Sequence, residues 1–326
     1  MTRRLHKRPK RRIVAAPFIP NRGQELSYAR DLAALCRPML KRVYSETVKA
    51  YREASTAFAL HKIGMDSAVD DLLFLLDDFR DEYTGEFDVM ALPLAENMVE
   101  GQVETVNREF PKIINGALGR EYAQYAPNPA PAPVTTLEEP AAVREFFTPP
   151  PAEPPPPTAP NPFAIPGNIF DISPQMTVAI KAAIAENVAL IKSIPAQYLD
   201  QVAGAVTRAM TSASSIRQLA DEIKSYSLMT DRRAKNIALD QVRKVHAALN
   251  LRRMQDAGIT HFKWMHVGGS VKPRPFHIAD HPEGLNGGIF SIEDPPVIEP
   301  NTGITGFPGD LPFCRCVMQA VIELDD

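Results

Sequence analysis

The sequence is poor in the features that mark membrane proteins and disulfide-stabilised proteins. Its 326 residues include only three cysteines, and this small odd number argues against a disulfide framework. The longest strongly apolar run, Leu72 to Leu76, is far too short to span a bilayer, so we expect no membrane partner. The basic N-terminus also lacks the apolar core of a secretory signal, so we expect synthesis in a cytoplasm without export by that route.

A strong net charge is missing as well. The formal net charge is -3, so no overall field draws the chain to nucleic acid. The first twelve residues are the local exception, with no acidic side chain and seven basic ones: Arg3, Arg4, Lys7, Arg8, Lys10, Arg11 and Arg12. Such a run neutralises phosphates without reading sequence, so its functional interpretation is an arm that binds nucleic acid, such as double-stranded DNA, or an acidic partner. The alternative is a solvated flexible tail.

Proline, in contrast, is abundant, and many of the 31 prolines lie between Pro127 and Asn168. Because proline removes backbone donors and favours extended neighbours, this stretch cannot form a helix or a central strand. We therefore expect residues 126–168 to be a semi-rigid linker. The apolar segment from Val143 to Phe147 within it is either a docking segment for a partner groove or a chance cluster.

Apolar residues recur at helical spacing on both sides of this linker. Before it, one stripe repeats at intervals of four, three and four: Val99, Val103, Val106 and Phe110. We expect a basic flexible arm over 1–23 and a helical domain over 24–125. After it, Ser173 and Pro174 form a helix start signal, because serine caps free amides and proline is tolerated in the first turn.

Further signals divide residues 169–326 into helices over 173–257 and a strand and loop region over 260–326. We expect Pro195 to end the first helix, Thr230 to cap a later one and Gly258 to occupy a left-handed C-terminal position. The segments Thr260 to Val267 and Cys316 to Leu324 have the pattern of strands. The predicted class is α+β and predominantly helical, with an all-α N-terminal half and a C-terminal helical bundle followed by a small, loop-rich β-containing domain.

Four potential metal ligands lie in the loop-rich region: His277, His281, Cys314 and Cys316. Two imidazoles and two thiolates are a proper tetrahedral set for a structural zinc ion, although the Cys-x-Cys gap is tighter than usual. The alternative is that the cysteines are small buried residues at the start of the last strand. A third interpretation is a metal-dependent nuclease that uses Asn286, but no second histidine follows Asn286 in the sequence. Arg274 is either an anion contact or a structural donor to backbone carbonyls.

The order of several short motifs resembles a known family. The residues concerned are Gly258, Trp264, Arg274, Pro275, His277, Asn286, Gly287, Phe290, Cys314, Arg315 and Cys316. Together they are similar to the phage Mu F-like minor head proteins, also called head morphogenesis proteins, over about the last 150 residues. The resemblance implies a virion component without catalysis, made in the bacterial host cytoplasm and located in the head interior or at the portal vertex. Its implied partners are the portal protein and the major capsid or scaffolding protein; a DNA-escorting virion protein is the second hypothesis.

Overall fold

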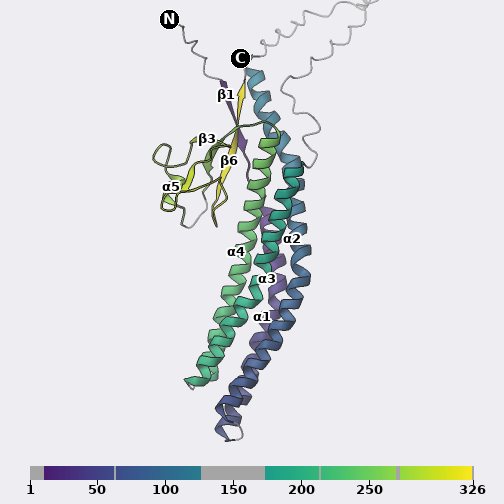
Figure 1. Cartoon of the computed structure of the whole chain (residues 1–326), viewed down its shortest axis with the longest axis vertical. Helices are drawn as coiled ribbons and strands as arrows, with labels where there is room; N and C mark the ends of the chain where they lie inside the picture. The colour runs from purple at the N-terminus through teal and green to yellow at the C-terminus, as the bar shows by residue number, and fades with distance from the viewer. Residues whose placement is uncertain (1–10, 62–63, 126–172, 213, 269–271, 325–326) are drawn as a thin grey trace, which may run out of the picture.

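A computed structural model describes residues 11–61, 64–125, 173–212, 214–268 and 272–324, and shows a long helical bundle with a small sheet beside one end (Figure 1). The bundle consists of α1 (Arg22–Ala59), α2 (Met65–Tyr125), α3 (Pro174–Thr211) and α4 (Ile216–Asp256). A short helix, α5 (Pro275–Ile278), and several strands follow α4. The predicted class, predominantly helical α+β with a small antiparallel sheet near the C-terminus, is confirmed.

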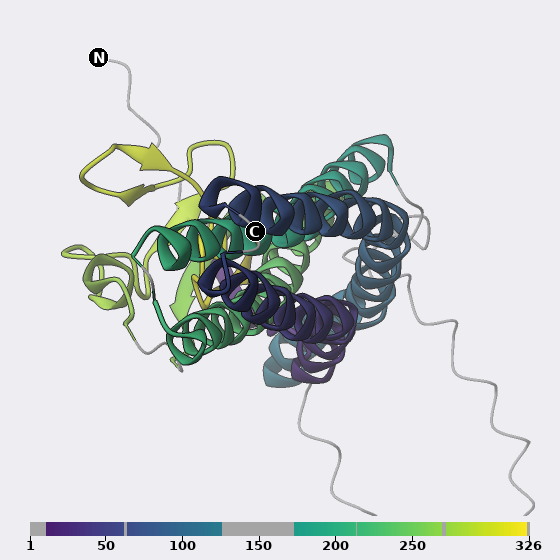
Figure 2. The same ribbon diagram turned by 90° about the horizontal axis from the view of Figure 1, so that it is seen from below.

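Helices from both sides of the proline-rich segment share one core. Seen from below, α1 to α4 surround a common centre, with the strands to one side (Figure 2). The contacts are closest between α1 and α4 and between α2 and α3, so each half of the chain packs on the other. The expected helical domain over 24–125 and the helices over 173–257 therefore lie side by side. The linker itself, with Val143 to Phe147, lies outside the described residues.

The helix boundaries correct two of the expectations. Ser173 caps α3 as expected, because its side chain accepts a hydrogen bond from the Met176 amide. Pro195 does not end this helix; it is buried within α3, and packing of the surrounding apolar face outweighs the loss of one backbone hydrogen bond. Thr230 likewise lies inside α4, whose actual cap is Ser215, in a capping box with Gln218.

The main sheet joins the two ends of the described chain. Its antiparallel strands run in the order β1 (Arg11–Pro17), β6 (Cys316–Leu324), β2 (His261–His266) and β3 (Ile289–Ser291). The sequence predicts β2 and β6 well. It does not predict β1, which falls in the expected flexible arm over 1–23: Arg11 pairs with Leu324, and Arg12 forms a 2.8 Å ion pair with Glu323. The other five basic residues of the arm lie outside the described residues.

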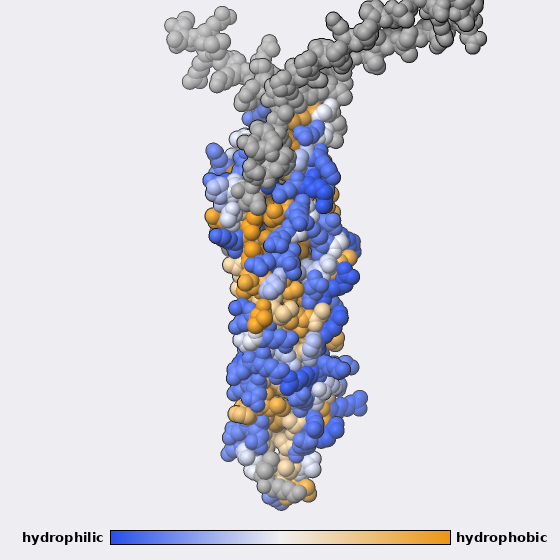
Figure 3. Space-filling view, turned by 90° about the vertical axis from the view of Figure 1, so that its right-hand side faces the viewer, coloured by the Kyte–Doolittle hydropathy of each residue, from blue (hydrophilic) through white to orange (hydrophobic). Residues whose placement is uncertain are grey.

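The rest of the loop-rich region contains a two-stranded hairpin, β4 (Val297–Glu299) and β5 (Ile304–Thr305). The space-filling view of the right-hand side of the bundle shows hydrophobic groups between hydrophilic ones along its length (Figure 3). Among the described residues, no helix combines the length and apolar character needed to cross a bilayer.

Candidate metal centre

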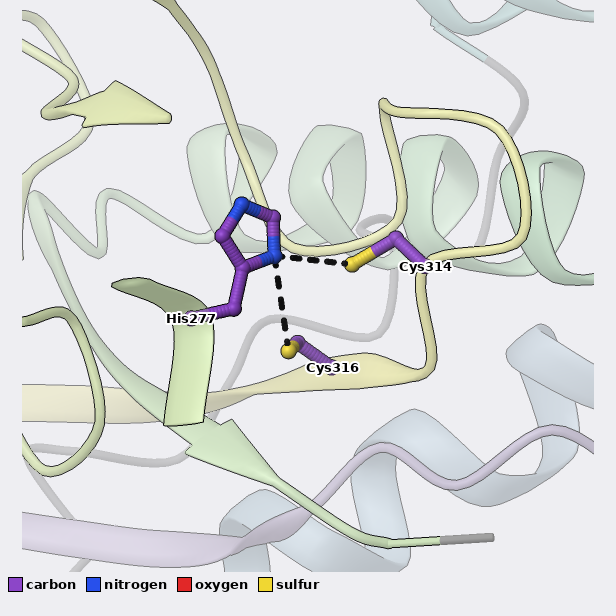
Figure 4. A group of neighbouring side chains, drawn as sticks. All are labelled: His277, Cys314 and Cys316. Carbon is purple, nitrogen blue, oxygen red and sulfur yellow. Dashed lines mark hydrogen bonds between the residues drawn. The ribbon is translucent and has the colours of Figure 1, made fainter. Parts of the chain in front are cut away.

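Three segments of the loop-rich region bring His277, Cys314 and Cys316 together (Figure 4). His277 lies in α5, Cys314 in the turn before β6, and Cys316 is the first residue of β6. His277 Nδ1 lies 3.5 Å from Cys314 Sγ and 3.9 Å from Cys316 Sγ. All three side chains are buried, and their ligand atoms lie within 4.8 Å of one another, so this group can hold a metal ion.

The turn that carries Cys314 is anchored to the bundle. The Cys314 amide donates to the carbonyl of Leu311, which closes the turn. Phe313 within it has a positive φ of 59°, a conformation that a bulky residue adopts only when its surroundings impose it. Its amide donates to the carboxylate of Asp240 on α4, and this bond holds the turn in place. The position of Cys314 therefore depends on the bundle as well as on the sheet.

The tautomer of His277 follows from a second hydrogen bond. Its Nε2 lies 2.9 Å from the carbonyl oxygen of Ile298 in β4, and a carbonyl oxygen only accepts, so Nε2 carries the proton. In the neutral ring, Nδ1 then has the free lone pair and faces the two sulfurs. The ring also meets the indole of Trp264 edge-on, with centroids 5.1 Å apart. Metal-binding histidines are commonly oriented by such a hydrogen bond from the second ring nitrogen to a backbone carbonyl.

The two thiols titrate as a pair. The hydrogen bond from the Cys316 thiol, together with the backbone amides of Cys316 and Gly309, lowers the pKa of Cys314 despite its burial. The same contact, burial and the charge of Cys314 raise the pKa of Cys316, against the opposing effects of Trp264 and Arg274. The pair therefore favours a thiolate on Cys314 next to a thiol on Cys316, whose proton a cation must displace to bind both sulfurs.

His281 takes no part in this group, contrary to the sequence-based expectation. Its side chain is exposed and packs edge-on against Phe290, with centroids 5.6 Å apart. A His-x3-His pair shares one face only where a helix continues, and α5 ends at Ile278. His266 lies near the cysteines instead, with its Nδ1 3.7 Å from Cys316 Sγ. The sequence does offer a signal for His266. It lies near the end of one predicted strand, and another predicted strand starts at Cys316, so pairing of the two strands can bring these residues together.

Asn286 and Gly287 hold the intervening loop against β2. Asn286 Oδ1 accepts from the His266 amide at 3.0 Å, and its Nδ2 donates to Asp280 at 2.8 Å. Gly287, with a φ of 79°, donates its amide to the carbonyl of Trp264 at 2.9 Å. Both polar atoms of the Asn286 side chain are thus engaged in structural bonds, which gives no support to the nuclease interpretation.

The remaining motif residues also have structural contacts. Both terminal nitrogens of Arg274 donate to the carbonyl of Pro312 at 3.2 Å, which is the contact that the structural alternative predicts. Trp264 is fully buried in the sheet. Gly258 has a φ of 70° just after α4, as expected. Burial and the nearby Arg243 lower the pKa of Arg315.

The segment that contains this cluster is similar to known proteins. Residues 200–319 match the family model described as "Phage Mu protein F like protein". The match confirms the resemblance for this part of the chain, which includes the C-terminal end of α3 from Asp200 to Thr211, all of α4 and the whole His/Cys cluster. A Haemophilus influenzae protein described as "Uncharacterized protein" is 36% identical over 151 residues, which cover 46% of this chain and 31% of that relative. No solved structure gives a significant match.

Proposed function

We propose that the protein is a phage head morphogenesis protein: a minor virion component at the portal vertex that acts in head assembly or genome delivery without catalysis. The observation that carries this proposal is the Mu F-like match over residues 200–319. The residues of the motif support a structural function, since Arg274, Asn286 and Gly287 all bind neighbouring backbone or side chains. These contacts hold the loop in place.

The shape of the molecule suits a connecting part of an assembly. The sheet, with both ends of the described chain, lies towards one end, and the bundle extends well beyond the sheet to the α1–α2 and α3–α4 turns (Figure 1). A rod of this kind offers separate surfaces at its two ends. The proposed partners are the portal protein and the major capsid or scaffolding protein of the same phage.

We further propose that the cluster holds a structural zinc ion through His277, Cys314 and Cys316. Thiolate and imidazole are the ligands that zinc takes in structural sites. A bound zinc ion would tie α5 to the start of β6 and so stabilise the loop between β2 and β6, a region with little regular structure. The alternative is a clasp of buried thiols and imidazole held by hydrogen bonds alone.

A second candidate function is DNA contact through the N-terminal basic run. Five of its basic residues precede β1, and the Arg12 side chain in β1 remains 46% exposed beside Glu323. The strand fixes where this run ends, at the edge of the sheet formed by β1. Contact with packaged DNA is compatible with a place in the head interior.

Deletion of the gene from the phage that encodes it tests the main proposal. We expect purified wild-type particles to contain the protein at a few copies per portal ring, as measured by quantitative mass spectrometry. Particles that lack it should be malformed, or should fail to deliver DNA, and a plasmid copy should restore infection. Absence of the protein from wild-type virions, together with normal heads and infectivity in the deletion, would refute the proposal.

A further inference from the structure

We infer that His266 is the fourth ligand of the metal centre, so that the site is a closed set of two imidazoles and two thiolates. This inference rests on the proposed zinc ion and adds the residue that completes its coordination. The register of the sheet is the first observation in its favour. His266, the last residue of β2, pairs directly with Cys316, the first residue of β6, so the two side chains are neighbours on one face.

The nitrogen–sulfur distances are those of ligands that share one ion, and His266, which lies outside the group of three whose ligand atoms are all within 4.8 Å of one another, would turn towards the ion on binding. Zinc bonds of about 2.3 Å to sulfur and about 2.0 Å to nitrogen place a sulfur and a nitrogen ligand roughly 3.6 Å apart. The observed nitrogen–sulfur separations are 3.7 Å from His266 to Cys316 and 3.5 Å and 3.9 Å from His277 to Cys314 and Cys316. Cys316 thus lies between the two imidazoles, each of which presents its Nδ1.

The surroundings leave space for an ion and for little else. A cavity of about 20 Å³ is lined by all four residues together with Arg274 and Phe313. That volume corresponds to about one water-sized guest. The backbone at His266 is fixed by the bond from its amide to Asn286 Oδ1, so the side chain leaves β2 in a defined direction.

Four protein ligands distinguish a structural site from a catalytic one. Catalytic zinc sites keep a coordination position open for water or substrate, whereas structural sites are filled by protein side chains. With His266 bound, the ion joins β2, α5, the turn before β6 and β6 itself. The metal would therefore close the loop region from both ends and activate no water.

Cobalt substitution of the full chain tests this inference, because Co²⁺ reports the number and type of its ligands. We expect the wild type to bind one ion with the intense visible absorption of a tetrahedral site and with sulfur-to-cobalt charge transfer. His266→Ala should bind at least about 100-fold more weakly, or with an altered visible spectrum, since it loses a ligand itself and not merely a supporting bond. The matched control His281→Ala should behave like the wild type.

The outcomes distinguish this inference from the zinc proposal on which it rests. If the wild type binds neither cobalt nor zinc, the metal proposal itself fails. If the wild type binds but His266→Ala gives the same spectrum and affinity, His266 is not a ligand and only the further inference is overturned. His266→Cys distinguishes the loss of a ligand from misfolding. This variant should retain one tetrahedral ion, with stronger charge transfer from a third sulfur. A spectrum that still shows two sulfurs would also contradict the inference.

Discussion

The imidazole of His277 is hydrogen-bonded through Nε2 to the main-chain carbonyl of Ile298, and this 2.9 Å contact determines which nitrogen faces the cysteines. The bond joins α5 to β4, while Nδ1 on the opposite side of the ring lies beside Cys314 and Cys316. One side chain thereby connects the hairpin to the start of β6. The loop-rich region is held together at this point.

Removal of the metal should destabilise the protein. For a free zinc concentration about 1,000-fold above its dissociation constant, binding contributes about 4 kcal/mol to the free energy of unfolding. At about 2–4 °C per kcal/mol for a chain of this size, a Cys314→Ser, Cys316→Ser variant should lose roughly 10 °C in Tm. Calorimetry with and without a chelator measures the effect. His281→Ala is the control and should keep the wild-type Tm. A wild-type Tm that changes with neither chelator nor added zinc would contradict the prediction.

The buried ion pair between α1 and α4 should contribute strongly to bundle stability. Arg243 donates to both carboxylate oxygens of Glu25 at 2.7 and 3.1 Å, and the Glu25 side chain is only 6% exposed. Glu25→Gln should cost about 3 kcal/mol, because it leaves the Arg243 charge without its partner. Urea unfolding measures this loss. Glu46→Gln, which removes an exposed partner of Arg42, is the control and should cost under about 0.5 kcal/mol; similar losses for both would contradict the prediction.

Local patterns in the sequence predict those elements that local forces determine. The start of α3 at Ser173, the left-handed Gly258 and the strand from Cys316 to Leu324 all follow from short-range chemistry. β1 cannot be predicted in this way, because its partner β6 lies about 300 residues further along the chain and the alternating pattern is hidden in a basic run. The expectation for Pro195 is wrong because tertiary packing stabilises a long helix through an unfavourable residue.

The residues of the candidate site also divide into those that the sequence predicts and those that only long-range pairing reveals. His277 and the two cysteines are recognisable as ligands by type alone, and the structure brings them together. The proposed fourth ligand cannot be recognised in this way. Spacing along the chain favours His281, whereas register across the sheet places His266 opposite Cys316. Strand register is set by long-range pairing, which one sequence does not display.

The same substitution should have opposite effects at two glycines. Gly258 follows α4 with a φ of 70°, and Gly258→Ala should destabilise by about 1 kcal/mol because a Cβ disfavours this conformation. Gly116 lies within α2 and has open space where the Cβ of an alanine would lie, so Gly116→Ala should stabilise by about 0.5–1 kcal/mol. Paired chemical denaturation curves test the sign of each change. Stabilisation by Gly258→Ala would be inconsistent with its left-handed conformation, and destabilisation by Gly116→Ala would contradict the open space at that position.

The buried imidazole of His246 should make the protein acid-sensitive. Burial lowers the pKa of His246 to about 4, with the backbone of Phe18 opposing the shift. Because the unfolded state then binds the proton first, stability is complete above the unfolded pKa of about 6.5 and is lost as the pH falls towards 4. His246 alone should cost about 2 kcal/mol between pH 7 and pH 4.5. His246→Phe should remove this part of the pH dependence; an identical pH profile in both proteins would count against it.

Deletion of residues 1–10 should test DNA binding without disturbing the sheet. The cut leaves β1 intact, including the ion pair between Arg12 and Glu323, and removes five basic residues: Arg3, Arg4, Lys7, Arg8 and Lys10. If all five contact phosphates of duplex DNA, the magnitude of the slope of log affinity against log salt should fall by about 4.5, since each contact contributes about 0.9. A variant with these five residues changed to glutamine separates charge from length and should match the deletion.

Fluorescence anisotropy with a short duplex at several salt concentrations gives the slopes. Equal slopes for wild type and both variants would show that the arm does not bind DNA, because losing phosphate contacts must reduce the release of counterions.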